Sequence, residues 1–342
     1  MSLSSATVIQ EPDDSPRWAA LEADLDAAHV NVLQISAGRV EWTAFDWDQH
    51  PEAAAAPGGD RIAHALQQVG TRPDGTRRDF ELVVDALIPN WIASDPSVAG
   101  RTADGTAAQY APSASAIATG AVGQRYVDYA VALATRYKPM GIIFTDLRLD
   151  DETFGDDDLA LYRQMTGAKD WPRDQSGRLR TTATEIGAWR SDVLAGLLGR
   201  VRAALDGVTD QVGHRVELGV DVRVDWKDPA AGRPEAGHDY RKLAAKADRL
   251  VLWAYLGTDD KTPADVGRLV SGVATVVPVD RFTVSVGLWQ GADSANVVGP
   301  ARLAQAVAAA DKAGSLSTNV TPRSLMSPDH WRDLAQVWPR WP

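Results

Sequence analysis

The sequence predicts an α/β protein that folds as one (β/α)8 TIM barrel, a single domain over residues 1–342 with long loops after several strands. Short apolar runs typical of strands alternate with amphipathic helical stretches about eight times, which produces parallel strands joined by right-handed crossovers. The apolar runs are nearly continuous, as expected for strands that are covered on both faces. A length of 342 residues suits a single barrel.

The expected strands are spread along the whole chain. The clearest is Met140–Asp146, because the apolar run Gly141–Phe144 leads into a polar end at Thr145 and Asp146. Apolar, β-branched and aromatic residues dominate the other runs as well, as is usual in strands. The expected strands are Ala6–Gln10, His29–Ser36, Phe80–Pro89, Met140–Asp146, Val216–Val224, Arg249–Leu256, Phe282–Trp289 and Leu316–Val320.

Amphipathic stretches between these runs predict the helices. Their apolar residues recur at three- and four-residue spacing, which places one apolar face against the sheet. Several begin at or just after a proline, which suits the first helical turn, and Ser15 is a candidate N-cap for the first helix. The expected helices are Pro16–Ala28, Val122–Tyr137, Glu185–Leu205, Asp239–Ala247, Pro263–Thr275, Pro300–Ala313 and Pro328–Val337.

Large connecting segments follow the second, third and fourth expected strands. They cover Glu41–Gly59, Asn90–Gly120 and Arg148–Thr184, and they are too long for simple connectors. In a barrel they would build the face at the carboxyl ends of the strands. The acidic residues Asp150–Glu152 and Asp156–Asp158 do not follow the calcium-loop pattern, and Asp156–Asp158 suit the first turn of a helix.

Several classes of fold and cofactor site have no support in the sequence. A doubly wound open sheet, the main alternative fold, would usually carry a glycine-rich phosphate loop after its first strand, and Ser36–Arg39 does not supply one. The chain has no cysteine, which excludes disulfides, thiolate catalysis and cysteine-ligated zinc. Its six histidines lack metal-ligand spacing. We therefore expect no cofactor and no metal.

Charge and hydropathy limit the partners. The formal net charge of −11 disfavours nucleic acid and anionic lipid, and no apolar run reaches the roughly 18 residues that span a membrane. Twelve tryptophans stand against five phenylalanines, and indole rings offer flat faces for sugar rings. The residues Met1–Leu3 are typical of a cloning remnant, which would imply an exported protein whose signal peptide has been removed. The sequence indicates no oligomeric state.

Polar residues at the carboxyl ends of the expected strands form the candidate site, since barrel enzymes place their catalytic groups there. Asp85, Asp146 and Asp221 lie on neighbouring strands, which are only about 4.8 Å apart in a sheet. Asp225 is a fourth candidate acid. The alternative to a catalytic role is that it is a solvated loop residue next to Lys227. Two carboxyl groups that flank a glycosidic bond are the usual requirement for its acid–base cleavage.

Asp146 is the leading catalytic candidate, because a carboxylate at the end of an apolar strand is costly unless it is hydrogen-bonded or used. The alternative to a catalytic role for Asp146 is a structural one, as a helix cap or in an ion pair with Arg148. Arg148 is itself a candidate for binding a substrate oxygen. Asp85 has a buried structural acid as its alternative. Further candidate substrate-binding residues, with a core role as the alternative for each tryptophan, are Asn90, Trp91, Trp253, Tyr255, Trp289, Gln290 and Asn319.

Several motifs together resemble the bacterial family-10-like glycosyl hydrolases, barrel proteins related to cell-wall and exopolysaccharide hydrolases. Their order and spacing match over roughly Ala6–Trp338, which is nearly the whole chain. The motifs that carry the resemblance are Asp85–Asn90 with Asp95-Pro96 and Asp104-Gly105, Val122–Tyr137, Gly141–Arg148, Phe154–Tyr162 with Thr166-Gly167, and Trp189–Asp192 with Arg200–Ala203.

The chain departs from the family pattern in two places. The family's strand end often holds two acids before the arginine, whereas this chain has Thr145-Asp146-Leu147-Arg148 and so only one acid. The family's Pro-Tyr-Arg after the third strand is Pro89-Asn90-Trp91 here, which keeps an aromatic residue and loses the arginine. In substrate-assisted hydrolases, an N-acetyl group of the sugar replaces the second carboxylate.

The resemblance implies a glycoside hydrolase that cleaves a bacterial envelope or extracellular polysaccharide, including one that contains amino sugars. Asp146 would act as the general acid, with Asp85 or Asp221 as its carboxylate partner. A second interpretation is a non-catalytic carbohydrate-binding barrel that has lost one catalytic acid. A third, a barrel lyase or aldolase, would need a Schiff-base lysine at a strand end, and no expected strand ends in lysine.

Overall fold

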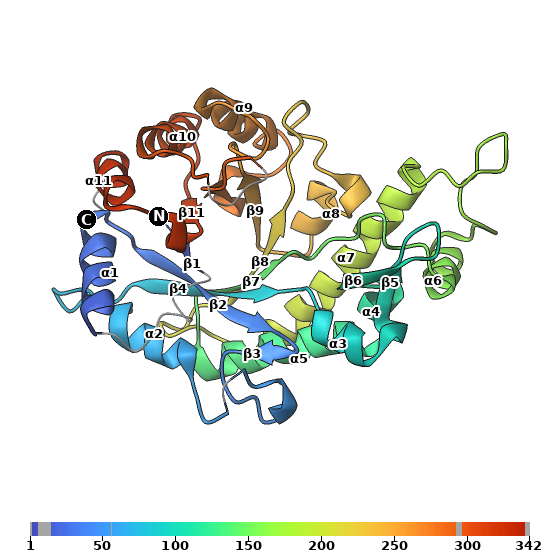
Figure 1. The fold of residues 1–342 in the computed structure, drawn as a ribbon, viewed down its shortest axis with the longest axis horizontal. Coiled ribbons are helices and arrows are strands. Elements are labelled where there is room, and N and C mark those ends of the chain that lie inside the picture. Colours follow the sequence, from blue (N-terminus) through green and yellow to red (C-terminus); the bar gives the residue numbers. More distant parts are fainter. Residues whose placement is uncertain (1, 6–14, 56, 292–295, 339–342) are drawn as a thin grey trace.

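The centre of the molecule is a curled sheet of parallel strands (Figure 1), seen in a computed structural model that describes residues 2–5, 15–55, 57–291 and 296–338. The two-residue strand β3 (Trp42–Thr43) pairs antiparallel with β2 and stands off the main path. In sheet order, the parallel strands are β1 (Ser2–Ser5), β2 (Val32–Arg39), β4 (Asp79–Asp85), β7 (Gly141–Thr145), β8 (Glu217–Val222), β9 (Arg249–Ala254), β10 (Phe282–Gly287) and β11 (Thr318–Thr321).

The sheet curls so far that its two end strands, β1 and β11, contact each other. No backbone ladder joins this pair in the part of the chain that the structure describes. Inside the curl, the Asn319 side chain on β11 donates a hydrogen bond through Nδ2 to Gln34 on β2. The predicted α/β fold with parallel strands is confirmed as an eight-stranded curled sheet, and closure into a complete barrel stays a prediction.

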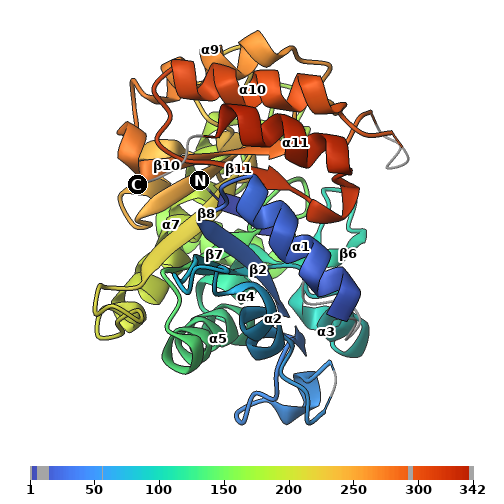
Figure 2. The ribbon, with the colours of Figure 1, turned by 90° about the vertical axis from the view of Figure 1, so that its left-hand side faces the viewer.

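Helices cover the outer face of this sheet (Figure 2). Each turns an apolar stripe inward, as α9 does with Val266, Leu269 and Val273. The main outer helices are α1 (Ser15–Ala27), α2 (Arg61–Val69), α5 (Ala121–Tyr137), α7 (Thr184–Leu205), α8 (Tyr240–Ala244), α9 (Pro263–Val273), α10 (Pro300–Lys312) and α11 (Pro328–Val337). No helix of the described residues is both long and apolar enough to cross a membrane.

Most predicted elements agree with the observed bounds to within a few residues, and the exceptions have local causes. The strand expected over Phe80–Pro89 ends at Asp85, because Pro89 occupies the first turn of a short helix. The helix expected over Asp239–Ala247 covers only Tyr240–Ala244: it starts one residue later because Asp239 caps it by accepting from the backbone N–H of Arg241, and it ends three residues earlier. Helix α2 was not predicted, and the strand expected over Ala6–Gln10 lies outside the described residues.

The long connecting segments contain short elements of their own. The elements of the second and third segments gather on one side of the molecule, toward the right of Figure 1. The acids Asp156–Asp158 stand in the first turn of α6, as predicted, where they complement the positive end of the helix dipole. These elements are α3 (Pro89–Ser94), β5 (Ala99–Arg101), β6 (Ala107–Pro112), α4 (Ala114–Ala118) and α6 (Asp156–Thr166).

Alternation along each strand separates an apolar layer from a polar interior. In β9, Leu250 and Leu252 are buried in the core between sheet and helices, whereas Val251 and Trp253 face the inside of the curl. A one-residue shift in register would exchange the two sets. The inside of the curl holds several buried polar side chains: Gln34, Glu81, Thr283, Ser285 and Asn319. Such groups are costly to bury without partners, so this interior is a candidate for function.

Candidate active site

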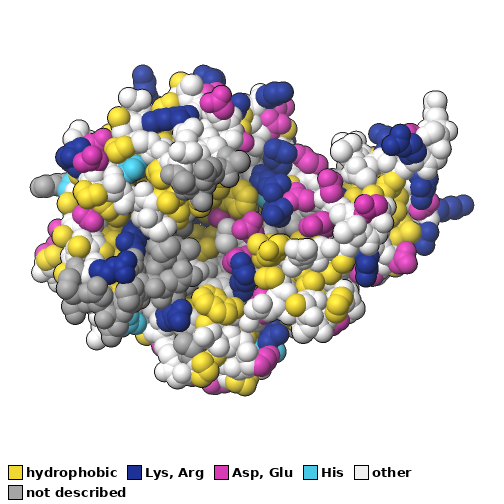
Figure 3. Space-filling model, in the orientation of Figure 1, with side chains coloured by type: hydrophobic (Ala, Val, Ile, Leu, Met, Phe, Trp, Pro, Cys, Tyr) yellow, Lys and Arg dark blue, Asp and Glu magenta, His cyan; other side chains and the backbone are white. Residues whose placement is uncertain are grey.

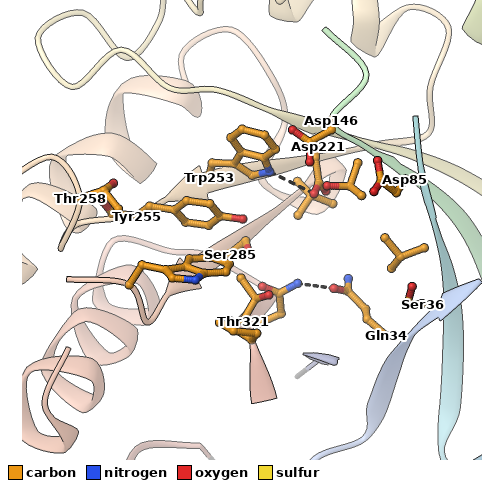
Figure 4. A pocket seen from close by; sticks show the side chains of 16 residues that line it. Gln34, Ser36, Asp85, Asp146, Asp221, Trp253, Tyr255, Thr258, Ser285 and Thr321 are labelled. Carbon is orange, nitrogen blue, oxygen red and sulfur yellow. Dashed lines mark hydrogen bonds between the residues drawn. The ribbon is translucent and has the colours of Figure 1, made fainter. Parts of the chain in front are cut away.

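A cavity of about 470 Å³ lies inside the curl, at the carboxyl ends of the strands (Figure 4). This is the end of a parallel α/β sheet at which barrel enzymes place their active sites. On the face seen in Figure 3, the molecule is hollowed near its centre, with acidic and basic side chains along the margin. The cavity is lined by Gln34, Ser36, Val83, Asp85, Thr145, Asp146, Asp221, Val251, Trp253, Tyr255, Thr258, Ser285, Trp289, Asn319, Thr321 and Pro322.

Asp221 projects into this cavity from β8, close to Asp146 (Figure 4). Its Oδ2 accepts a hydrogen bond from Nε1 of Trp253 at 3.0 Å, and Thr145 also hydrogen-bonds to it. Burial raises the pKa of the Asp221 carboxyl to about 7, and the nearby charge of Asp146 adds to the rise. A carboxyl group that keeps its proton near neutral pH can act as a general acid.

Asp146 follows the last residue of β7 and turns the chain sharply. Its φ is 55°, in the left-handed region that residues other than glycine rarely adopt. The side chain is about one-third exposed, and its Oδ1 accepts from Nε of Arg148 at 3.3 Å. Arg148 also binds Asp150, which in turn accepts from Nη1 of Arg223 at 2.9 Å. Asp146 is therefore the solvent-open carboxylate of the cavity and is oriented by an arginine–carboxylate network.

Asp85 ends β4 and lies on the other side of Asp146 (Figure 4). Its Oδ2 accepts from Nε of Arg39 at 2.7 Å, and its Oδ1 accepts from the backbone N–H of Leu87 at 2.9 Å. Burial raises the pKa of the Asp85 carboxyl, while these two partners oppose the rise. With both oxygens engaged, Asp85 has less freedom to react than Asp221 and Asp146.

An aromatic wall, made of Trp253, Tyr255 and Trp289, lines the same cavity as the carboxyl groups. Figure 4 shows Trp253 and Tyr255 beside Asp221. The rings of Trp253 and Tyr255 are stacked, with centroids 5.4 Å apart and an interplanar angle of 10°. Tyr255 and Trp289 lie 5.1 Å apart at 53°. Gly287 makes room for this arrangement, because a Cβ there would lie 2.4 Å from Cδ1 of Tyr255. Flat apolar rings of this kind are platforms for the faces of sugar rings.

The floor of the cavity is a ladder of buried amide and carboxyl groups. Gln34 donates through Nε2 to Oε2 of Glu81 at 2.7 Å and accepts from Nδ2 of Asn319 through its Oε1. This direction leaves Oδ1 of Asn319 without a hydrogen-bond partner among the described residues, although the side chain is 99% buried. Val83 and Val251 line the walls near this floor. The floor thus combines an unsatisfied acceptor with apolar contact surface.

Most of the predicted site residues meet in this cavity. Asp85, Asp146, Asp221 and Asn319 line it, together with the three residues of the aromatic wall. Arg148 lies beside it through its contact with Asp146. Three others lie outside the lining and have structural contacts: the backbone N–H of Asn90 donates to Glu41, Trp91 packs under the guanidinium of Arg125, and Gln290 accepts from Arg302.

Sequence reasoning missed several residues of the site. Gln34, Ser36 and Ser285 line the cavity, and each interrupts an otherwise apolar strand. Gln34 and Ser36 are two apart, so they share one face of β2, and this signal was available in the sequence. Asp225 occupies the loop position that was its alternative, where Oδ1 accepts from the backbone N–H of Lys227 and Asp228.

Two features narrow the chemistry of the cavity. No lysine is among the residues that line it in the described part of the chain, so a Schiff-base mechanism lacks its nucleophile there. The cavity instead unites one carboxyl group whose pKa is raised to about 7, one carboxyl group that is open to solvent, and a platform of aromatic rings. These are the groups used to cleave glycosidic bonds.

Comparison with known proteins gives a fold and no sequence family. No family model matches the chain, and no curated protein matches its sequence. The PgaB (BpsB) glycoside hydrolase domain from Bordetella bronchiseptica has a similar structure, with a TM-score of 0.71 and 15% sequence identity over 98% of each chain. The catalytic domain of β-amylase from Paenibacillus polymyxa has a TM-score of 0.67 and 12% identity, over 98% of this chain and 96% of that one.

The spore cortex-lytic enzyme SleL from Bacillus cereus is a further similar structure, with a TM-score of 0.54 and 12% identity over 99% of this chain and 73% of that one. At identities this low, the likeness shows the fold alone. The chain therefore has the α/β fold found in these glycoside hydrolases, with the candidate site at the carboxyl ends of its strands.

Proposed function

We propose that this protein is a glycoside hydrolase that cleaves a bacterial envelope or extracellular polysaccharide. The observation that carries the proposal is the pairing of two unlike carboxyl groups in one cavity. Asp221 has a pKa raised to about 7, whereas Asp146 is open to solvent on the neighbouring strand. Environments that separate two carboxyl groups in this way assign the acid and the base of a hydrolase. Membership of the family-10-like group is part of this proposal.

In this mechanism, Asp221 donates its proton to the glycosidic oxygen as the carbon–oxygen bond breaks. Asp146 then stabilises the positive charge that develops on the sugar, either by bonding to the anomeric carbon or by taking a proton from the attacking water. Arg148 orients Asp146, and Trp253 holds Asp221 through its indole N–H. The sequence alone favoured Asp146 as the acid, and the buried setting of Asp221 supports the reverse assignment.

An amino sugar at the cleavage position is the finer part of the proposal. The N–H of an N-acetyl group would donate to Oδ1 of Asn319, which has no partner among the described residues, and its methyl group would contact Val83 or Val251. A plain hydroxyl group would satisfy only the first of these. The deacetylated form keeps an N–H donor but loses the methyl group, whose burial is worth about 1 kcal/mol. An N-acetylated oligosaccharide should therefore be cleaved roughly fivefold faster than its deacetylated form.

The test is release of reducing ends from a panel of bacterial polysaccharides that includes peptidoglycan strands and poly-N-acetylglucosamine. Asp221→Asn and Asp146→Asn should each lose activity by about a hundredfold or more. Asp225→Asn is the matched control, because that acid follows the same strand and serves only a turn. Melting curves of the three variants show whether the fold is retained. Full activity in either site variant would contradict the assignment.

A carbohydrate-binding protein without catalysis is the second candidate function, and the aromatic wall is the observation that favours it. It predicts that a polysaccharide binds and stays uncleaved, with an affinity that survives Asp221→Asn and falls in Trp253→Ala.

An exported location belongs to both candidates, since envelope and extracellular polysaccharides lie outside the cell membrane. Immunodetection in the extracellular or periplasmic fraction of the source cells tests it.

A further inference from the structure

A smaller chamber of about 260 Å³ adjoins the main cavity beside the aromatic wall. The two spaces share Trp253, Tyr255 and Thr258, so a ligand stacked on this wall reaches both. The remaining lining of the chamber is mostly charged: Arg223, Val224, Arg233 and Asp259.

Arginines are concentrated around this chamber. Burial lowers the pKa of the Arg223 guanidinium, and the like charges of Arg148 and Arg233 lower it further. Crowding three cations is unfavourable unless anions are also present. The chain as a whole carries a net charge of −11, so an overall excess of positive charge does not explain the cluster.

The carboxylates of the protein satisfy this cluster only in part. Asp150 is shared, since it accepts from Arg148 and from Nη1 of Arg223. Arg233 uses Nε to bind Glu235. No other side-chain N–H group of Arg223 or Arg233 is hydrogen-bonded to the described residues. These guanidinium groups are about one-third exposed and therefore still have donors to offer.

Arg223 is held in place by its backbone. Its N–H donates to Nδ1 of His238 at 3.0 Å, and its carbonyl accepts from the hydroxyl of Tyr240 at 2.7 Å. The carboxylate in the chamber, Asp259, already accepts from Nε1 of Trp226 at 2.7 Å. Among the residues that line the chamber, two arginines, of which Arg223 is anchored, thus stand against one acid that is already hydrogen-bonded. Asp150 and Glu235, outside the lining, each take one N–H group of these arginines.

We propose that the arginine chamber binds the carboxylate of an acidic sugar next to the cleavage position. The planar guanidinium fork matches the two oxygens of a carboxylate, and charge-assisted hydrogen bonds of this kind are about twice as strong as neutral ones. The shared wall of Trp253 and Tyr255 would hold the ring of that sugar. The inference rests on the proposed function only in taking the ligand to be a carbohydrate.

The test is binding, so that it stands apart from hydrolysis. Glucuronate, its methyl ester and methyl sulfate are titrated against the whole chain at low ionic strength, with ligand-observed NMR as the readout. The ester keeps the ring and removes the charge. We expect glucuronate to bind at least about fivefold more tightly than the ester. Its affinity should fall as salt is added. Equal binding of acid and ester would overturn the proposal, as would a preference for methyl sulfate.

Arg223→Gln and Arg233→Gln should each weaken glucuronate binding by about fivefold or more and leave the ester unchanged. Arg332→Gln, on the exposed face of α11, is the control for the loss of one positive charge. The Arg233 side chain is partly exposed and, among the described residues, bonds Glu235 alone, so its variant tests the chamber even where Arg223→Gln lowers the melting temperature. Equal losses for acid and ester would assign these arginines to neutral hydroxyl contacts and refute the inference. A chain that cleaves no glycan and still prefers glucuronate would refute only the proposed function.

Discussion

At the scale of single residues, the two central carboxyl groups differ because the backbone presents them differently. Asp221 lies within β8 and faces the inside of the curl, next to an indole and a threonine. Asp146 lies one residue beyond β7 in a left-handed conformation, which turns its side chain into the open part of the cavity. Strained conformations of this kind are concentrated at functional sites. Asp221 is therefore buried and Asp146 partly exposed, although the two residues come from neighbouring strands.

The Asp221→Asn variant should lose activity and gain stability. A carboxyl group whose pKa is raised to about 7 in the folded state binds its proton more tightly than in the unfolded chain. The stability it supplies is present at low pH and is lost as the pH rises from about 4 to 7. An amide cannot ionise, so at pH 8 the free energy of unfolding of the variant should exceed that of wild type by on the order of 2 kcal/mol. Its melting temperature should be higher accordingly.

The pH profile of the wild-type enzyme gives the matching activity measurement. Because the acid must be protonated, kcat/KM should fall about tenfold per pH unit above pH 7. The control is Asp225→Asn, which should keep the wild-type profile and the wild-type melting temperature. If Asp221→Asn is less stable than wild type at pH 8, the folded protein stabilises the ionised carboxylate of Asp221, and both predictions for this residue are wrong.

His238 should make the fold sensitive to acid. It is buried and accepts from the backbone of Arg223, while its other ring nitrogen contacts the carbonyl of Leu147. Burial lowers the pKa of its imidazole to about 4, and the charges of Arg223 and Arg148 add to this. The stability it supplies is complete above the unfolded pKa near 6.5 and is lost as the pH falls toward 4, by up to about 3 kcal/mol.

The measurement compares urea unfolding of wild type and His238→Gln between pH 7 and 4.5. Buried carboxyl groups such as Glu81 and Asp158, whose pKa values are raised by burial, gain stability over the same range. The difference between the two proteins isolates the histidine. That difference should shrink as the pH falls, and a constant difference would contradict the prediction.

Among single residues, the sequence predicted the carboxyl groups and aromatic rings better than the polar floor. Asp146 stands out because it ends an apolar run, and Trp253 and Trp289 stand in the carboxyl-terminal halves of two other expected strands. Gln34 and Ser285 look like isolated defects in apolar strands, and only the folded sheet shows that they converge. The pKa of Asp221 depends on burial, which is a tertiary property that no local pattern contains.

At the scale of elements, the end of β10 determines the shape of the aromatic wall. Gly287 is the last residue of that strand, and the ring of Tyr255 fills the space where a side chain would stand. Gly287→Ala should displace this ring, lower kcat/KM by about tenfold or more and destabilise the fold by roughly 1–3 kcal/mol. Steady-state kinetics and thermal melting check both effects.

Gly196→Ala is the control for this experiment. Gly196 lies within α7, and a Cβ there would meet nothing within 4 Å. Alanine is the better helix former, so this variant should gain about 0.5–1 kcal/mol and keep full activity. Wild-type kinetics in Gly287→Ala would show that Tyr255 tolerates another position.

Helices and strands were predictable wherever an apolar run or an apolar helical stripe extended over most of the element. Strands β7 and β9 and helix α7 were found to within two residues, because apolar runs and stripes define them. The segment Asn90–Gly120 was expected to be a loop, and it holds two short helices and the β5–β6 hairpin. The elements of this segment are three to six residues long and, unlike β7 and β9, lack a continuous apolar run, so no local pattern identifies them and tertiary contacts stabilise them. Trp91 lies in this segment, and for the same reason its position away from the cavity was not predictable.

At the scale of the whole molecule, the first and last helices close the structure around one core. α1 packs against α11, although they stand at opposite ends of the sequence. The buried apolar cluster runs without a break from Trp18 to Trp338. The floor of the cavity repeats this closure, since Gln34 near the start of the chain binds Asn319 near its end. Closure of this kind depends on distant contacts, which is why the sequence suggested a barrel but did not show how its ends meet.

These contacts predict that residues 1–342 unfold as one domain. Calorimetry should show a single transition, with a calorimetric enthalpy close to the van't Hoff value. Trp331→Ala removes a buried side chain of α11 and should shift the entire transition downward, by about 3–5 kcal/mol of stability. Two separable transitions, of which Trp331→Ala moves only one, would mean that the halves of the chain fold independently. In that case, the contact between α1 and α11 would be a domain interface, and the cavity would depend on how two domains dock.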